Sequence, residues 1–307
     1  MRCLEAASGR RLWEVRTEAA AKGAPAAGCG CCAVLEVTGR LHVLETASGQ
    51  RRWSVDLPGH PERWIFTAPV VGYGLVFAGA RAGYGAWDLD TGAQRWYTPL
   101  ESGDNWSCHA SPLLRRGLLV ALVQRRGLVA LRVDSGTLAW EQPLGVEYYY
   151  AAPVRAGDLL VTGGDPGHLA VLQATTGEVL WHQGVLESAY ATGLSVSGET
   201  IYATASDGRV RAVDLHSGEV RWTFQSGPEL LDMTPYRRGG ASLLAAPAVR
   251  GQAVMVAGLD GVLYALLGRT GTCLGQASFG APLSAAPAWG RQGLFVATYD
   301  GRLLRYC

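Results

Sequence analysis

Polar and aromatic side chains that could bind a ligand gather in a few short segments of the chain. The densest segment is Asn105-Trp106-Ser107-Cys108-His109, where amide and imidazole groups flank an indole ring. Amide and imidazole nitrogens hydrogen-bond to polar ligands, and the face of an indole stacks on planar groups. The segment predicts ligand contacts by Asn105, Trp106 and His109, although a capped strand with a satisfied histidine would use the same residues.

Three consecutive tyrosines, Tyr148, Tyr149 and Tyr150, form a second segment. Because side chains alternate along an extended strand, two of these rings face one side and one faces the other. The tyrosines predict either a stacking platform for a ligand or aromatic packing at the rim of the fold.

A third segment, residues 226–242, is an insertion that contains Arg237 and Arg238. Long loops in compact domains are commonly functional or disordered. Two adjacent guanidinium groups can clamp a carboxylate or phosphate, or can be solvated charges. We name as the loop face the side of the predicted fold on which the connections from the fourth to the first strand and from the second to the third strand of its units lie. Together with aromatic residues of this loop face, the candidate ligand-binding residues are Trp64, Asn105, Trp106, His109, Tyr148, Tyr149, Tyr150, Tyr190, Tyr236, Arg237 and Arg238.

Catalytic and metal-binding motifs are missing from the sequence. The six histidines are scattered, and the seven cysteines form no paired set of Cys-x-x-Cys motifs of the kind that holds zinc. No Gly-x-Ser-x-Gly motif and no phosphate-binding loop is present. The sequence therefore predicts no catalytic residue and no metal site.

A repeated element must position the candidate residues. Ser or Thr, then Gly, then three residues, then Trp recurs as Ser8-Gly9…Trp13, Ser48-Gly49…Trp53, Thr91-Gly92…Trp96, Ser135-Gly136…Trp140, Thr176-Gly177…Trp181 and Ser217-Gly218…Trp222. The tryptophans stand 40, 43, 44, 41 and 41 residues apart, and a seventh copy, Thr270-Gly271, carries Gly275 in place of the aromatic residue. A period near forty residues is typical of stacked supersecondary units. A Trp in constant phase predicts packing between neighbouring units rather than ligand binding.

Each unit has the pattern of four β-strands. A first strand follows an Ala-Pro or Ser-Pro pair in six units, and Thr192-Gly193 has the same phase in the fifth. A second strand is apolar throughout, a third alternates, and a fourth holds the Trp. Seven first-strand openings, at residues 25, 69, 112, 153, 193, 247 and 287, predict an all-β, seven-bladed β-propeller of four-stranded antiparallel blades in a single domain, residues 1–307. We expect the N- and C-terminal strands to close the last blade together. Both ends offer a third strand and only one can take that position, so we expect the first few residues to be either frayed or left over from a longer parent chain.

Composition excludes several classes of protein. Hydrophobic residues make up 48% and charged residues 17% of the 307 residues, which is typical of a folded domain and not of a disordered chain. With a net charge of +1, no overall field attracts nucleic acid, and no apolar run is long enough to span a membrane. Met1–Val15 lacks an apolar signal core, and the cysteines form no disulfide framework. We therefore expect a cytoplasmic protein, either a monomer or a domain appended to a larger chain.

The pattern Ala-x-Asp-x-x-Thr-Gly-x-x-x-Trp, clearest from Ala86 to Trp96, resembles the repeat of pyrroloquinoline-quinone-like β-propellers over essentially the whole chain. The resemblance implies that each Trp docks on the Thr-Gly turn of the next blade. It covers dehydrogenases, which bind the quinone with calcium and place two adjacent cysteines against it, and also non-enzymatic scaffolds. Cys31-Cys32 resembles that cysteine pair, but it lies on an apolar second strand where two small side chains can simply pack.

Two functions are compatible with these residues. The leading hypothesis is a non-catalytic propeller without a cofactor, which binds a protein partner or a small polar ligand through its loop face and could be the interaction domain of a larger enzyme. The alternative is a dehydrogenase that oxidises a sugar or an alcohol with pyrroloquinoline quinone and calcium, or another propeller enzyme.

Overall fold

The computed structural model describes residues 1–58, 67–80, 82–100, 108, 110–145, 152–164, 166–186, 193–230 and 243–306. Every regular element in these residues is a β-strand, and strands of one sheet pair antiparallel in chain order. None of the described residues forms a helix that could cross a membrane. The all-β prediction is confirmed.

The chain forms two compact units, Met1–Pro153 with Ala174–Gly177, and Val154–Gln173 with Glu178–Cys307. The sheets of the first unit are β1–β2 (Arg2–Leu4, Arg11–Glu14), β3–β6 (Ala26–Gly28, Cys31–Leu35, Arg40–Glu45, Arg51–Asp56), β7–β10 (Val70–Gly72, Leu75–Ala80, Gly83–Asp88, Gln94–Pro99) and β11–β14 (Leu113–Arg115, Leu118–Val123, Gly127–Arg132, Leu138–Gln142). The sheets of the second unit are β15–β18 (Val154–Ala156, Leu159–Gly164, His168–Gln173, Val179–Gly184), β19–β22 (Gly193–Ser197, Thr200–Thr204, Arg209–Asp214, Val220–Gln225), β23–β26 (Ala248–Arg250, Ala253–Ala257, Val262–Leu267, Cys273–Ser278) and β27–β29 (Ala288–Gly290, Gly293–Ala297, Leu303–Tyr306). That the whole chain is one domain remains a prediction.

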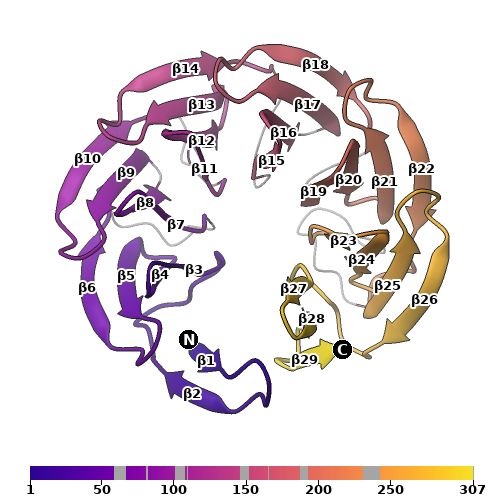
Figure 1. Cartoon of the computed structure of the whole chain (residues 1–307), viewed down its shortest axis with the longest axis horizontal. Helices are drawn as coiled ribbons and strands as arrows, with labels where there is room; N and C mark the ends of the chain where they lie inside the picture. Colours follow the sequence, from indigo (N-terminus) through magenta and orange to yellow (C-terminus); the bar gives the residue numbers. More distant parts are fainter. Residues whose placement is uncertain are drawn as a thin grey trace. The chain divides into compact units, whose positions relative to one another are not determined.

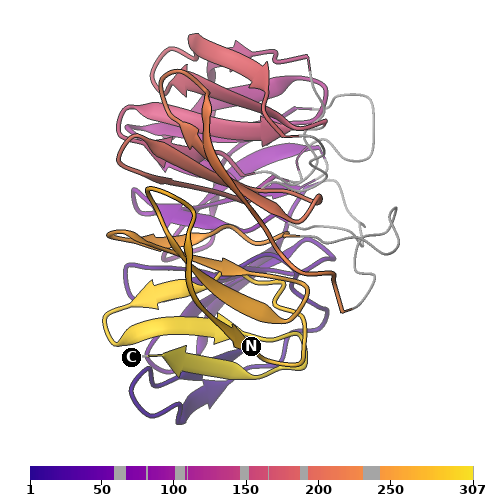
Figure 2. The same ribbon diagram turned by 90° about the vertical axis from the view of Figure 1, so that its right-hand side faces the viewer.

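Strands that follow one another in the sequence lie side by side within each sheet, as the labels of Figure 1 show. Figure 2 shows the antiparallel strands of the C-terminal sheet β27–β29 in yellow. Such hairpin pairing follows from the short turns between runs of alternating and apolar residues.

The pattern of burial explains which strands lie inside. The second strand β12 is buried at every residue, as expected for a strand that is apolar on both faces. The fourth strand β22 is exposed or half-buried throughout and carries polar residues. The second strand β12 therefore lies in the core, and the fourth strand β22 lies nearer the surface.

The Ser/Thr-Gly turns have the geometry that glycine permits. Gly92 has a φ of 73°, and its N–H donates to the carbonyl of Asp88 over 2.9 Å. The Asp88 carboxylate accepts hydrogen bonds from Arg95 and from the N–H and hydroxyl of Thr91, and these bonds lower the pKa of Asp88. The turn is thus closed by both its backbone and its side chains.

Core clusters join consecutive sheets within each unit. In the first unit, Leu41 and Val43 of β5 pack with Val76 of β8 and Trp87 of β9. In the second unit, residues of β16 and β17 pack in the same way with residues of β20 and β21. Each sheet therefore buries its faces against its neighbours, as the blades of a repeat propeller do.

The predicted first strands are confirmed at all seven openings, because β3, β7, β11, β15, β19, β23 and β27 begin there. The expectation of frayed N-terminal residues is wrong, since β1 pairs with β2 from Arg2 to Leu4. The third-strand position beside β28 is taken by β29. That the two chain ends complete a seventh blade remains a prediction.

Candidate binding site

All candidate ligand-binding residues predicted from the sequence lie outside the described residues. They are Trp64, Asn105, Trp106, His109, Tyr148, Tyr149, Tyr150, Tyr190, Tyr236, Arg237 and Arg238. Their role in binding therefore remains a prediction.

Hydrogen bonds hold two described chain segments that are close in sequence to these candidates, at Ala110 and at Gly227. The buried Tyr84 donates its hydroxyl hydrogen to the carbonyl of Ala110 over 2.6 Å, and burial raises the pKa of Tyr84 well above its usual value. At the start of the insertion, the Asp260 carboxylate accepts hydrogen bonds from the Tyr264 hydroxyl and from the Gly227 N–H, the latter over 2.8 Å. Burial and the Asp260 contact raise the pKa of Tyr264 to about 12. Both tyrosines are neutral structural anchors at physiological pH.

The tryptophans of the repeat dock on the turn of the next sheet in their unit, as predicted. Trp53 Nε1 donates to the carbonyl of Leu89 over 2.9 Å, and a Cβ added at Gly92 would lie 2.8 Å from the indole ring. The same contacts recur at Trp13, Trp96, Trp181 and Trp222. These rings are occupied by packing between sheets, which confirms their structural role.

Gly275 lies where the seventh Trp would be. The repeat tryptophans pair with a third-strand residue next to a β-bulge, in the pairs Trp96↔Ala86, Trp140↔Ala130, Trp181↔Val171 and Trp222↔Ala212. In the sheet β23–β26, Gly275 pairs with Ala265 next to the same bulge. The register therefore assigns Gly275 to the position of the missing indole ring.

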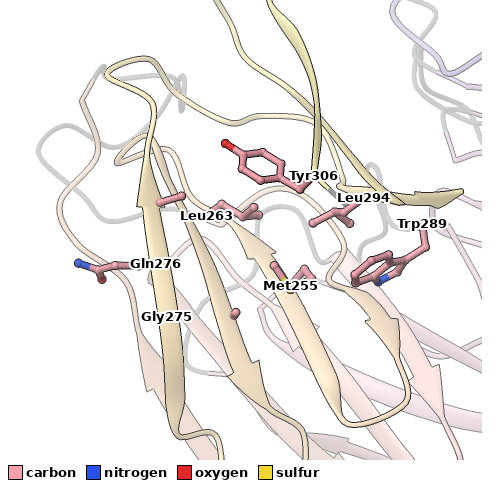
Figure 3. Close-up of a pocket in the computed structure, with 9 residues that line it drawn as sticks. Met255, Leu263, Gly275, Gln276, Trp289, Leu294 and Tyr306 are labelled. Carbon is pink, nitrogen blue, oxygen red and sulfur yellow. The ribbon is translucent and has the colours of Figure 1, made fainter. Parts of the chain in front are cut away.

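A cavity of about 340 Å³ occupies this position, and we name it the Gly275 cavity. It lies between the sheets β23–β26 and β27–β29 and is lined by Met255, Leu263, Ala265, Gly275, Gln276, Ala277, Trp289, Leu294 and Tyr306. Figure 3 shows Met255, Leu263, Leu294, Trp289 and Tyr306 around one space, whereas the Gln276 side chain points away from them. None of the nine lining residues carries a charge.

The sequence contains a signal for this cavity, namely Gly275 in place of the repeat Trp, from which no cavity was predicted. The loss of Trp in one copy of a regular repeat predicts either a filled gap or a void, and local patterns do not distinguish the two. Packing decides, because neighbouring side chains either collapse into the space or leave it open.

The cysteine pair that resembles the one in quinone dehydrogenases does not fit a quinone site. Cys31 and Cys32 lie on β4 and are 0% and 8% exposed. The Cys31 thiol donates to the carbonyl of Gly28 over 3.0 Å, and burial raises the pKa of both thiols. Among the residues that the structure describes, no group of three or more metal-ligating side chains comes together.

Two histidines that the sequence left scattered meet in the structure. His168 Nδ1 and His182 Nε2 are 3.2 Å apart, on the neighbouring strands β17 and β18. Burial, followed by the neighbouring His168, lowers the pKa of His182. The signal for this contact was the hairpin turn at Thr176-Gly177, which folds the two strands together.

Comparison with known proteins agrees with the fold. A family model described as outer membrane protein assembly factor BamB matches residues 1–148 and 147–306. No curated protein sequence matches the chain significantly.

Solved structures show the same architecture at low sequence identity. BamB from Moraxella catarrhalis is 19% identical with a TM-score of 0.78, covering 97% of this chain and 89% of that protein. The computationally designed Ika8 protein is 17% identical with a TM-score of 0.78, covering 98% of this chain and 88% of that one. The quinohemoprotein alcohol dehydrogenase ADHIIG from Pseudomonas putida HK5 is 16% identical with a TM-score of 0.73, covering 95% of this chain and 66% of that one. These similarities show the fold alone.

The expectation of a cytoplasmic protein is wrong, because the family model is described by a factor of outer membrane assembly. That expectation depended on the cysteines and on the first residues of the sequence. The described cysteines form no disulfide. Cys31 and Cys32 are adjacent on β4, and neighbouring side chains on a regular strand point to opposite faces, so the two thiols do not face each other.

Proposed function

Because this chain belongs to the β-propeller family of the outer membrane protein assembly factor BamB, we propose that it is a non-catalytic propeller that binds a protein partner through its loop face. An assembly factor acts by binding other proteins, and loops carried on a rigid scaffold are the usual place for such contacts. The candidate residues Trp106 and Tyr149 would supply the aromatic contacts that commonly dominate binding energy at protein interfaces.

The burial of Cys31 and Cys32 supports the scaffold over the dehydrogenase. A thiol pair that acts against a quinone must reach the cofactor, whereas both side chains are buried and Cys31 packs in the core with Ala33 and Leu35. Their raised pKa values also disfavour the thiolate, the reactive form of cysteine. Both observations support a structural role for the pair.

The partner site is tested with Trp106→Ala and Tyr149→Ala. We expect each variant to weaken binding of a partner identified by affinity capture by at least tenfold, because truncating an aromatic contact at a binding hot spot costs about 2 kcal/mol or more. Binding is measured by isothermal titration calorimetry, and folding by circular dichroism. The control is Tyr73→Ala, which removes a 60% exposed tyrosine at the turn between β7 and β8. Unchanged affinity in both loop variants would contradict the assignment of the site.

A separate experiment tests the absence of catalysis. The purified protein is mixed with pyrroloquinoline quinone and calcium, passed through gel filtration, and assayed for dye reduction with alcohols and sugars. We expect no retained quinone absorbance and no dye reduction. Retained quinone together with substrate-dependent reduction would overturn the proposed function.

A further inference from the structure

The Gly275 cavity corresponds to a space that a tryptophan ring fills in other sheets of the second unit. In the second unit, the rings of Trp181 and Trp222 fill the corresponding space between their sheets and donate to the carbonyls of Leu215 and Gly268. Gly275 has the same register on β26, so the space left open beside it is the space of an indole side chain. Its volume of about 340 Å³ exceeds the roughly 150 Å³ of an apolar cavity that admits benzene.

The lining restricts the chemistry of an occupant. Leu263 and Leu294 are buried, and the aromatic rings of Trp289 and Tyr306 stand at the side of the sheet β27–β29. Aromatic rings pack on one another in offset or edge-to-face geometry, and methionine sulfur packs well against a ring. The lining residues offer no charge that could pair with a charged ligand, so they favour an uncharged one.

Solvent can reach the cavity. Gly275 is exposed on the surface strand β26, and Tyr306 is 40% exposed. The volume also lies in the range of about 300–1,000 Å³ that is common for small-molecule sites. A ligand can therefore enter without unfolding either sheet.

We propose that the Gly275 cavity is a binding site for an uncharged, planar aromatic small molecule of about the size of indole. The ligand takes the place of the tryptophan ring that the seventh repeat lacks. This site is separate from the proposed partner site, because none of its lining residues is among the candidates on the loop face.

The first test uses indole as the probe and the methionines as reporters. The chain has three methionines, of which Met255 lines the cavity. With the methionine methyl groups labelled with carbon-13, we expect titration with indole to shift the Met255 signal and to leave the signals of Met1 and Met233 in place. The Met255 signal is assigned with Met255→Leu. An unshifted Met255 signal at millimolar indole would overturn the proposal.

The second test fills the cavity. A Cβ at Gly275 would meet no atom within 4 Å, and Gly275 does not have a positive φ, so the backbone accepts a larger residue. We expect Gly275→Trp to weaken indole binding at least tenfold and to raise the melting temperature, because the new side chain occupies the site. Indole binding as tight as in the unsubstituted protein would contradict the proposed location.

A matched control places the same side chain on the same strand outside the cavity. Leu274 precedes Gly275, is 61% exposed and does not line the cavity. We expect Leu274→Trp to bind indole as the unsubstituted protein does. We also expect indole-3-carboxylate to bind at least tenfold more weakly than indole, and equal affinities would refute the requirement for an uncharged ligand. These readouts do not involve the loop face, so their failure leaves the proposed function intact.

Discussion

At the scale of single residues, Glu36 and His42 form a polar pair that is buried in the core of the first unit. Both side chains are 1% exposed, and His42 Nε2 lies 2.9 Å from Glu36 Oε1. The carboxylate also accepts hydrogen bonds from the Thr38 hydroxyl over 3.0 Å and from the Glu18 N–H over 2.8 Å. Burial alone would raise the pKa of Glu36, but these hydrogen bonds outweigh it and lower the pKa. The carboxylate thereby ties the chain segment at Glu18 to the turn between β4 and β5.

This contact predicts a loss of stability in acid. Because the pKa of Glu36 is lower in the folded than in the unfolded protein, its contribution is present above the unfolded-state value of about 4.3 and is lost as the pH falls through the folded-state value. We expect Glu36→Gln to lower the free energy of unfolding by about 3 kcal/mol at pH 7, because it leaves a broken buried pair. We also expect its stability to change less than that of the unsubstituted protein as the pH falls below about 4.

Urea denaturation at a series of pH values measures both effects. Glu219→Gln, at an exposed position in a Ser/Thr-Gly turn, is the control and should keep the acid dependence of the unsubstituted protein. An identical pH dependence for Glu36→Gln would show that another group causes the loss of stability in acid.

At the scale of elements, the Ser/Thr-Gly turn combines two requirements in one glycine. The backbone needs a positive φ, and the absence of a Cβ lets the Trp of the preceding sheet lie directly on the turn. Gly136 meets both requirements, with a φ of 71° and the ring of Trp96 at 2.6 Å from an added Cβ. Gly9 meets only the first, since it has a φ of 72° and no atom within 4 Å of an added Cβ.

These two glycines separate the backbone effect from the packing effect. We expect Gly9→Ala to destabilise the protein by about 1 kcal/mol, which is the cost of a left-handed conformation. We expect Gly136→Ala to cost about 1–3 kcal/mol more, because the Trp96 ring must move. Urea denaturation of both variants gives the difference. Equal losses would mean that the docked ring adapts freely to a methyl group.

At the scale of the whole molecule, the repeat predicts how the chain unfolds. Each sheet is stabilised chiefly by contacts with its neighbours, and a single domain unfolds cooperatively. We expect the β-sheet circular dichroism and the tryptophan fluorescence to follow one coincident transition in urea. Two separate transitions would show that the two compact units are independent domains, against the prediction of one domain over residues 1–307.

Much of the fold was predictable because its signals are local. Six of the seven first strands follow Ala-Pro or Ser-Pro pairs, and the turn glycines need no information from distant residues. The packing of Trp53 against the next sheet was predictable from the constant phase of the repeat, and its docking on the turn at Gly92 from the resemblance to quinone-like propellers. The meeting of His168 and His182 was missed because it depends on the register across a hairpin, which composition and spacing do not report.

By itself, the sequence determined an array of four-stranded β units with a structural Trp, because alternation and turn chemistry are properties of neighbouring residues and the repeat is a regular spacing along the chain. Only the tertiary structure decided what the exceptions in the repeat become. It buries Cys31 and Cys32 in the core, and it leaves the space beside Gly275 open although Met255 and Tyr306 stand next to it. Whether side chains close such a space depends on how two whole sheets pack, and no local pattern contains that information.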